Sequence, residues 1–411
     1  MKDQKQTVEG FAIHCRGHQD EYCGIWEFLT FGRDIIPIVR NSQIHFLKKD
    51  WINYPKSVVP IGIGFGEYDD HRPTGRLQNT CSALLVGQTL RIANKPGVNE
   101  LLGEVLWCDT KPKVFPTQLA NLIKAKHRIQ SGQMEHGTYR WALDAFDAIV
   151  FGKYDEKFDI RAALEQFWHD GKWSMQSSAN YHAAGEVDNQ VNQAYDSRNS
   201  FVTGLASIAA MMKMEIRSEW LDTAFKVMIR DAELYGQAIT EVNEKATVIE
   251  VETENGPEPV YLLKTDNEHI TKAAVSTKAG KASIVIVRDF DGHTCVLANP
   301  HRGMMLADFT VMVRMAEYEA RTGKKLLFSE ADGPGTRSVC PEWHLAFGNM
   351  LLNGSLTHPD VPASNLSLEK LGEIASSAFT RAKRDAWIAR YLAAGIEVPL
   401  DKVFDYALVK K

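Results

Sequence analysis

The sequence predicts an α/β protein in which an N-terminal domain with a largely parallel sheet precedes a smaller C-terminal α+β domain. In residues 1–169, short β-branched runs alternate with helical runs, which is the pattern of strands joined by crossover helices. Residues 170–200 are rich in Ser, Asn, Gln and Gly, and this composition predicts a connector or insertion. Residues 201–411 return to helical and strand-like runs. A chain of 411 residues has room for two such domains.

Several short apolar runs mark the strands of the first domain. The runs at 11–15, 34–41 and 57–65 are bounded by turn residues, as buried strands tend to be. A further run at 104–110 ends on Asp109, and we interpret it as another strand. Helices are expected between and after these runs, at 20–31, 81–93 and 115–129.

The second domain opens with a helical pattern at 216–243. A β-like run follows at 259–264, and 282–300 contains two strand-like runs joined by the dipeptide Asp291-Gly292, which is typical of a hairpin. A helix is expected at about 306–322. These elements predict a small antiparallel sheet with helices.

Composition excludes some classes of protein. The formal net charge is -5 and the pI is about 6.2, so no global basic field favours tight nonspecific binding of duplex nucleic acid. The polar start, MKDQKQTVEG, and the lack of any run of 18 apolar residues predict neither a signal peptide nor a membrane anchor. We therefore expect a cytoplasmic protein. The six cysteines lack C-x-x-C spacing, which predicts free or buried thiols.

Candidate metal ligands follow the first predicted strand. His14, His18 and Asp20 lie at i, i+4 and i+6 directly after it. In open α/β sheets, such strand-end turns are where ligands bind. One alternative is that Asp20 only caps the following helix. Another is a zinc site that uses both histidines with Cys15 and Cys23, but this spacing matches no common structural zinc site.

Two more predicted strand ends carry similar residues. Asp70 and His71 follow the run at 57–65, and Asp109 ends the run at 104–110. Imidazole and carboxylate ligands together suit Mn²⁺ or Mg²⁺, and a pair of such ions can activate water and stabilise a phosphoryl transition state. Because the pattern recurs at three strand ends of one predicted sheet, we expect one centre for one or two such ions.

These segments resemble motifs of the DHH-superfamily phosphoesterases. The pattern H-x3-H-x-D at 14–20 resembles the family's H-x3-D-x-D, and Y-D-D-H at 68–71 stands where the D-H-H signature is expected. C-S-A-L-L at 81–85 is similar to the family's S-S-A-x-L helix. Asp109-Thr110 with Phe115 resembles the D-T-G-x-F segment, which supplies a further metal-binding Asp. The four segments occur in the family's order.

Within the superfamily, the chain is most similar to the MYG-type exonuclease group. That group has H-C-D-E where this chain has H-Q-D-E at 18–21. It has Y-D-H-H where this chain has Y-D-D-H at 68–71. In the second domain, W-H-L-A-F-G at 343–348 and N-G-S at 353–355 resemble the group's H-A-x-G-F and G-G. The resemblance implies a DHH-like catalytic domain and action on RNA in the 3′ to 5′ direction. Two departures are Asp70 in place of the middle His and Asn353-Gly354 in place of a double glycine.

The resemblance also assigns roles to individual residues. It implies catalytic positions at Asp70 and His71, and metal ligation by His14, His18, Asp20, Asp70 and Asp109. It implies substrate binding by His344, Asn353, Gly354 and Ser355 in the second domain. Arg16 and Arg72 flank the two motifs of the first domain, so we expect Arg72 to act in catalysis and Arg16 to bind substrate, each by neutralising the scissile phosphate. Arg16 and Arg72 could instead be solvated ion partners of nearby acids. Asp147, three residues after Asp144, competes with Asp109 as the third acid.

The expected reaction is therefore metal-dependent hydrolysis of a phosphodiester, with single-stranded RNA or DNA as the substrate. Short oligonucleotides or signalling dinucleotides are the alternative substrates, since the negative net charge disfavours tracking along a long polyanion. A different class remains open, in which the chain is a catalytically silent nucleic-acid or nucleotide-binding protein. A hydrolase of small phosphate esters or polyphosphate is a third hypothesis. No membrane partner is expected, and a homodimer is compatible with the sequence.

Overall fold

The computed structural model divides into two compact units, and the boundary falls within helix α9 (Met214–Lys245). Among the described residues, the first unit runs to Glu233 and the second begins at Leu234. The predicted connector at 170–200 lies outside the described residues. The structure describes residues 7–47, 54–72, 75–110, 118–129, 135–151, 214–253, 256–276, 281–299, 302–346, 348–354, 360–393 and 395.

The first unit contains a parallel sheet of three strands in the order β2-β1-β3. The strands are β1 (Val8–His14), β2 (Ile38–Leu47) and β3 (Val58–Pro60). Phe11, Ala12 and Ile13 of the central strand β1 are fully buried, because a strand covered on both faces needs apolar side chains on both. The parallel sheet predicted for the N-terminal part of the chain is confirmed.

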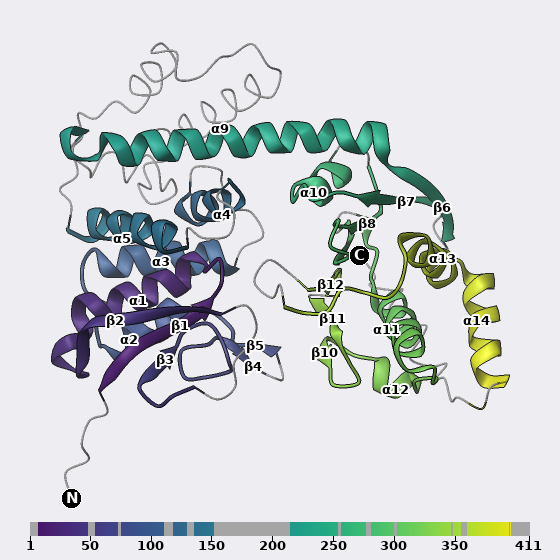
Figure 1. Ribbon diagram of the computed structural model, residues 1–411, viewed down its shortest axis with the longest axis horizontal. Coiled ribbons are helices and arrows are strands. Elements are labelled where there is room, and N and C mark those ends of the chain that lie inside the picture. The colour runs from purple at the N-terminus through teal and green to yellow at the C-terminus, as the bar shows by residue number, and fades with distance from the viewer. Residues whose placement is uncertain are drawn as a thin grey trace, which may run out of the picture. The chain divides into compact units, whose positions relative to one another are not determined.

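Helices pack on this sheet and on one another. They are α1 (Gln19–Phe31), α2 (Ser82–Thr89), α3 (Val98–Thr110), α4 (Leu119–Ile129) and α5 (Glu135–Phe151). Helices α1, α3 and α5 lie on one side of strands β1 and β2 (Figure 1). Helix α1 is buried along most of its length, and the indole Nε1–H of Trp26 donates to Asp147 Oδ1 of α5 at 2.8 Å. Asp147 thus ties two helices together.

The prediction of a strand at 104–110 is wrong. These residues form the last two turns of helix α3. Val98, Leu101, Leu102, Val105 and Cys108 are buried at the spacing of one helical face, and this periodicity of about 3.6 residues outweighs the short β-like run. Asp109 therefore lies at the end of a helix and not at the end of a strand.

The second unit contains a mixed sheet of seven strands in the order β10-β11-β12-β9-β8-β7-β6. Strands β7 and β8 pair in parallel and the other neighbours are antiparallel. The sheet is therefore larger than the small antiparallel sheet that the sequence predicts, although the expected pair β8 and β9 is present. The strands are β6 (Thr247–Thr253), β7 (Gly256–Lys264), β8 (Ile284–Arg288), β9 (Thr294–Ala298), β10 (Gly335–Arg337), β11 (Cys340–Ala346) and β12 (Met350–Asn353).

Both faces of this sheet are covered. Ile284 and Ile286 of β8 join the apolar cluster on one face, whereas Val285 and Val287 join the cluster on the other. This alternation explains why the strand is apolar at every position. The helices of this unit are α10 (Ile270–Val275), α11 (Ala307–Thr322), α12 (Phe328–Ala331), α13 (Leu368–Phe379) and α14 (Arg381–Ala393). Among the described residues, no helix has the length and apolar character needed to cross a membrane.

Candidate functional site

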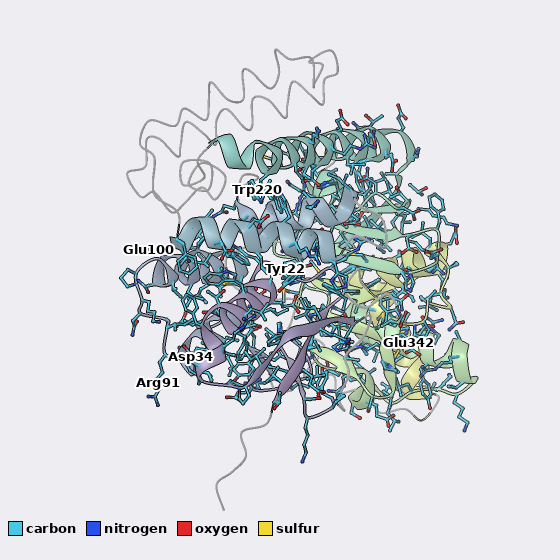
Figure 2. All side chains as sticks on the ribbon, turned by 60° about the vertical axis from the view of Figure 1, so that its left-hand side comes forward. Tyr22, Asp34, Arg91, Glu100, Trp220 and Glu342 are labelled. Carbon is cyan, nitrogen blue, oxygen red and sulfur yellow. The ribbon has the colours of Figure 1, made fainter. Side chains whose placement is uncertain are left out.

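A tight turn follows the central strand of the first unit and leads into helix α1. Arg16 takes the left-handed backbone conformation in this turn, with φ 56°. Gly17 follows, and a Cβ atom there would lie 2.6 Å from Cε1 of Tyr22, so the turn packs closely on this ring. Tyr22 lies among the helices (Figure 2). The turn therefore fixes where His18 and Asp20 begin the helix.

Glu21 holds the turn together. Its carboxylate accepts the backbone N–H of His14 at 3.2 Å and that of His18 at 2.6 Å, and it lies 2.7 Å from Nδ1 of His14. The loop after β3 approaches from the other side, since a Cβ atom at Gly62 would lie 2.7 Å from Cγ of Glu21. Gly62 has φ +70°, which favours glycine. Glu21 thus links the ends of two parallel strands.

Three acids from distant parts of the chain converge at this end of the sheet. Asp20, Asp70 and Asp109 each place a carboxylate oxygen within 4.8 Å of the others. Asp20 and Asp70 are 6% and 1% exposed, whereas the side chain of Asp109 is 19% exposed, so two acids are buried and the third lies at the rim. The structure thus brings together three of the five predicted metal ligands.

Arg76 lies between two of these acids. It belongs to β5 (Gly75–Arg76), which forms a two-stranded hairpin with β4 (His71–Arg72). Its Nε–H donates to Asp70 Oδ2, and its Nη2–H donates to Asp109 Oδ2. The guanidinium also donates to the backbone carbonyl of Asp109 at 3.2 Å. The guanidinium of Arg76 therefore offsets part of the negative charge of Asp70 and Asp109.

Burial and mutual repulsion disfavour the ionised form of all three carboxylates at once. Burial raises the pKa of the Asp20 carboxyl above its ordinary value, and the neighbouring Asp70 carboxylate raises it further. A hydrogen bond with Ser82 and the charge of Arg76 act in the opposite direction. Ser82 lies at the start of α2 and its Oγ is 3.5 Å from Asp70 Oδ1. A bound cation would relieve this repulsion.

The predicted histidine ligands lie beside the cluster. His18 shares a second group of candidate ligands with Asp20 and Glu21. Desolvation lowers the pKa of His18, which favours the neutral ring, the form that binds metal ions. His14 pairs with Glu21, and in the described part of the chain it belongs to none of the three groups of candidate ligands.

His71 lies at the rim of the site, with its side chain 56% exposed. Asp69 fixes its position, because Oδ1 of Asp69 accepts the backbone N–H of His71 at 2.9 Å and lies 3.2 Å from its Nδ1. The hydrogen bond with Asp69 raises the pKa of His71, and the charge of Asp70 adds to the effect. Arg72 donates to the carbonyls of Gly66, Asp69 and His71, so its guanidinium holds its own loop.

The residues predicted to bind substrate from the second unit lie on β11 and β12. The Nδ1 of His344 is 2.9 Å from Oγ1 of Thr336. Asn353 is fully buried, and its amide bonds to the carbonyls of Glu342 and Pro362 and to the backbone N–H of Ser364. Its side chain thus holds the segment that follows the strand. Gly354 has φ +72°, and Ser355 lies outside the described residues.

Sequence reasoning missed Glu21, Asp69 and Arg76. Glu21 and Asp69 each sit beside predicted ligands, and their acidic type was the available signal. Arg76 had no signal, since it lies in a two-residue strand without any pattern. All six cysteines are free, and the four cysteines of the first unit are buried. This confirms the prediction of free or buried thiols.

A buried acid on helix α3 gives a prediction for pH dependence. Glu104 is 7% exposed, its Oε1 has no hydrogen-bond partner, and burial raises its pKa to about 8. Its pKa in the unfolded chain is about 4.3, so the protonated acid stabilises the fold fully below about pH 4, and this contribution is lost as pH rises through 8. We expect Glu104→Gln to raise the melting temperature at pH 8.5 and to change it little at pH 4.5.

Thermal melts followed by circular dichroism at both pH values test this prediction. The difference at pH 8.5 corresponds to a free energy of unfolding on the order of a few kcal/mol. The exposed Glu244→Gln is the control and should change neither melt. An equal effect of Glu104→Gln at both pH values would contradict the titration of Glu104 as the cause.

Comparisons with known proteins assign no family. No family model matches the chain, and no curated protein matches it. Among the solved structures that align with it is an uncharacterized protein from Helicobacter pylori G27, at 9% identity over 91% of this chain and 98% of that chain. The TM-score is 0.22, so this alignment carries no argument about the fold or the site.

Proposed function

We propose that the first unit is a DHH-type phosphoesterase that holds Mn²⁺ or Mg²⁺ with Asp20, Asp70 and Asp109 and hydrolyses phosphodiesters. The proposal rests on the convergence of three carboxylates from distant parts of the chain. Three acids separated by 50 and 39 residues (70 − 20 and 109 − 70) place their oxygens within 4.8 Å of one another beside the ends of parallel strands. Such strand ends are where open α/β sheets bind ligands.

The donor set fits a hard divalent cation. Carboxylate oxygens are the ligands that Mg²⁺ and Mn²⁺ prefer, and the cluster offers three of them with the Ser82 hydroxyl beside Asp70. His18, whose burial favours the neutral ring, is next to the cluster and could add an imidazole. When bound, such an ion lowers the pKa of water and neutralises charge on the phosphoryl oxygens.

His71 supplies the acid of the proposed reaction. Its ring is exposed at the rim, and Asp69 fixes it by two contacts to one carboxylate oxygen. Because Asp69 raises its pKa, more of the ring is protonated near neutral pH than in a free histidine. An imidazolium placed there could bind a phosphate oxygen or protonate the leaving oxygen. Asp69 acts through His71 and is a positioning residue.

Arg76 favours a second candidate, a catalytically silent nucleotide-binding protein. Its guanidinium already contacts Asp70 and Asp109, where a metal ion would be held. If this ion pair is permanent, the acids need no metal and the site has no means of activating water. Binding of Mn²⁺ by the purified protein separates the two candidates, since the silent protein has no site for it.

The proposed substrate is the end of a single-stranded RNA or DNA, with short oligonucleotides or dinucleotides as the alternative. The net charge of -5 supports a substrate that makes few phosphate contacts. The salt dependence of substrate affinity measures the number of such contacts, because log K falls with log salt by about 0.7 per neutralised phosphate of a single strand. A shallow slope supports the short substrate and a steep one the long strand.

Hydrolysis of an end-labelled oligoribonucleotide tests the proposed function. We expect shortened products with Mn²⁺ and none with EDTA. Unchanged substrate at micromolar protein with Mn²⁺ would contradict the enzyme. Release of inorganic phosphate from small esters, without nucleotide products, would instead support a hydrolase of small anions.

A further inference from the structure

A pocket of about 580 Å³ lies in the first unit, and its lining residues are distinct from those of the acidic cluster. It is formed by the end of α1, the short helix η1 (Gly32–Asp34), the edge strand β2 and the start of α5. Its volume falls within the range of small-molecule sites, which is about 300–1,000 Å³. Nothing in the proposed hydrolysis uses this pocket.

The polar lining of the pocket is positively charged. Arg33 of η1 and Arg140 of α5 both line it and both are exposed. Neither makes an ion pair or a hydrogen bond in the described part of the chain, whereas Arg76 and Arg128 of the same unit each pair with an acid. Among the described lining residues none is acidic, and His136 adds a third basic group. Two guanidinium groups that face one volume without an acid favour an anion.

Tyr139 provides an independent sign of a missing partner. It lines the pocket, is 5% exposed, and its buried hydroxyl has no hydrogen-bond partner. Its ring packs edge-on against Tyr22 at 5.5 Å, so the side chain is held in place. A buried hydroxyl without a partner destabilises the fold. A ligand acceptor that reaches this hydroxyl would supply the partner that it lacks.

An irregularity in strand β2 brings further polar groups to the same place. Val8 pairs with Ile38, but Gly10 pairs with Gln43, so β2 carries extra residues between these two pairs. Such bulges redirect side chains and are frequent beside functional sites. Ser42 and Gln43, at the end of the bulge, both line the pocket. They add a hydroxyl and an amide to the polar lining.

We propose that this pocket binds an organic phosphate of nucleotide size. Arg33 and Arg140 bind the phosphate, because guanidinium groups match phosphate oxygens in geometry and charge. The Tyr139 hydroxyl donates to the same ligand. The remaining lining is apolar and receives the uncharged part of the molecule, with Leu29, Ile44 and Leu143 as its side chains. The site is separate from the acidic cluster and requires no metal.

Calorimetric titration of the full-length chain in EDTA with adenosine monophosphate, adenosine and inorganic phosphate tests the proposal. We expect adenosine monophosphate to bind at least about tenfold more tightly than either fragment, since each fragment lacks half of the contacts; this equals at least about 1.4 kcal/mol. No binding of adenosine monophosphate at millimolar concentration would overturn the proposal. Equal affinity for adenosine would also overturn it, because the arginines would then contribute nothing.

Variants locate the binding. Arg33→Gln and Arg140→Gln should each weaken the affinity for adenosine monophosphate about tenfold, or about 1.4 kcal/mol. The control is Arg91→Gln, whose side chain points away from the fold (Figure 2) and should leave the affinity unchanged. Tyr139→Phe should weaken binding severalfold while it preserves or raises the melting temperature. An affinity of Tyr139→Phe equal to that of the wild type would contradict the hydrogen bond proposed for this hydroxyl.

One further variant separates the pocket from the acidic cluster. Asp20→Asn should leave the affinity for adenosine monophosphate in EDTA unchanged. Loss of binding in this variant would place the ligand at the acidic cluster and overturn the assignment to the pocket. Failure of hydrolysis with intact binding in EDTA would contradict the proposed function and leave the pocket unaffected.

Discussion

Replacing Asp20 by asparagine is expected to lower kcat/KM for Mn²⁺-dependent hydrolysis by at least about a hundredfold, or about 2.7 kcal/mol of transition-state stabilisation. Asp20 is 6% exposed and belongs to the group of three carboxylates that would hold the ion. Asparagine keeps the shape of the side chain and removes its charge. Single-turnover hydrolysis of a labelled oligoribonucleotide measures the effect, and Asp109→Asn should reproduce it.

The same variant has an effect on stability that distinguishes metal binding from misfolding. Because burial and Asp70 raise the pKa of Asp20, the neutral asparagine should preserve or raise the melting temperature in EDTA at pH 8. It should also abolish the increase in melting temperature that Mn²⁺ produces in the wild type. Asp34→Asn is the control and should keep the increase in melting temperature with Mn²⁺, since Asp34 lies on the outer surface of the first unit (Figure 2). Turnover within about threefold of wild type in both Asp20→Asn and Asp109→Asn, a loss of less than about 0.7 kcal/mol, would show that the ligand set is wrong.

Arg76→Gln is expected to tighten Mn²⁺ binding at least tenfold. The guanidinium contacts Asp70 and Asp109, so it competes with a metal ion for the same carboxylates. A unit charge at about 4 Å contributes about 4 kcal/mol at an effective dielectric constant of about 20, which is ample for such a change. Titration of free Mn²⁺ by electron paramagnetic resonance measures both affinities.

The same titration decides between the two candidate functions. Arg140→Gln removes an arginine outside the cluster and should leave the affinity for Mn²⁺ as in the wild type. Weaker Mn²⁺ binding by Arg76→Gln would mean that Arg76 orients the acids and does not compete with the ion. Binding by the variant with none by the wild type would favour the silent protein, in which Arg76 has taken the place of the metal.

The turn after the first strand was predictable because its elements are local. Three residues at i, i+4 and i+6 follow an apolar run, and a helix begins at once. The strand, the turn and the helix all appear where expected. The contact between this turn and the loop after β3 depends on Glu21 and Gly62, which lie far apart in the sequence and share no pattern.

Asp109 lies close to Asp20 and Asp70 although the strand predicted to carry it is a helix. The run at 104–110 looks like a strand in isolation, but its apolar residues continue the spacing of Val98 and Leu101 on one helical face. The helix nevertheless ends beside Asp20 and Asp70. Asp147 was the alternative to Asp109 as the third acid of the cluster, and its carboxylate accepts a hydrogen bond from the indole of Trp26.

Arg76 and the second sheet were beyond sequence reasoning for different reasons. Arg76 reaches the acids through a hairpin of two-residue strands, which are too short to leave a periodic pattern. In the second unit, the segments 343–348 and 353–355 carry a resemblance to a family motif, and nothing in them predicts that Cys340–Ala346 and Met350–Asn353 form strands β11 and β12 of a seven-stranded sheet. Pairing between such distant strands is set by packing and not by local sequence.

Anomalous X-ray scattering from crystals grown with Mn²⁺ measures directly whether Asp20, Asp70 and Asp109 hold a divalent cation. We expect a peak about 2.1 Å from oxygens of all three carboxylates, with the Arg76 guanidinium displaced from Asp70 and Asp109. A peak elsewhere in the first unit, or none at saturating Mn²⁺ with Arg76 still paired to both acids, would contradict this ligand set.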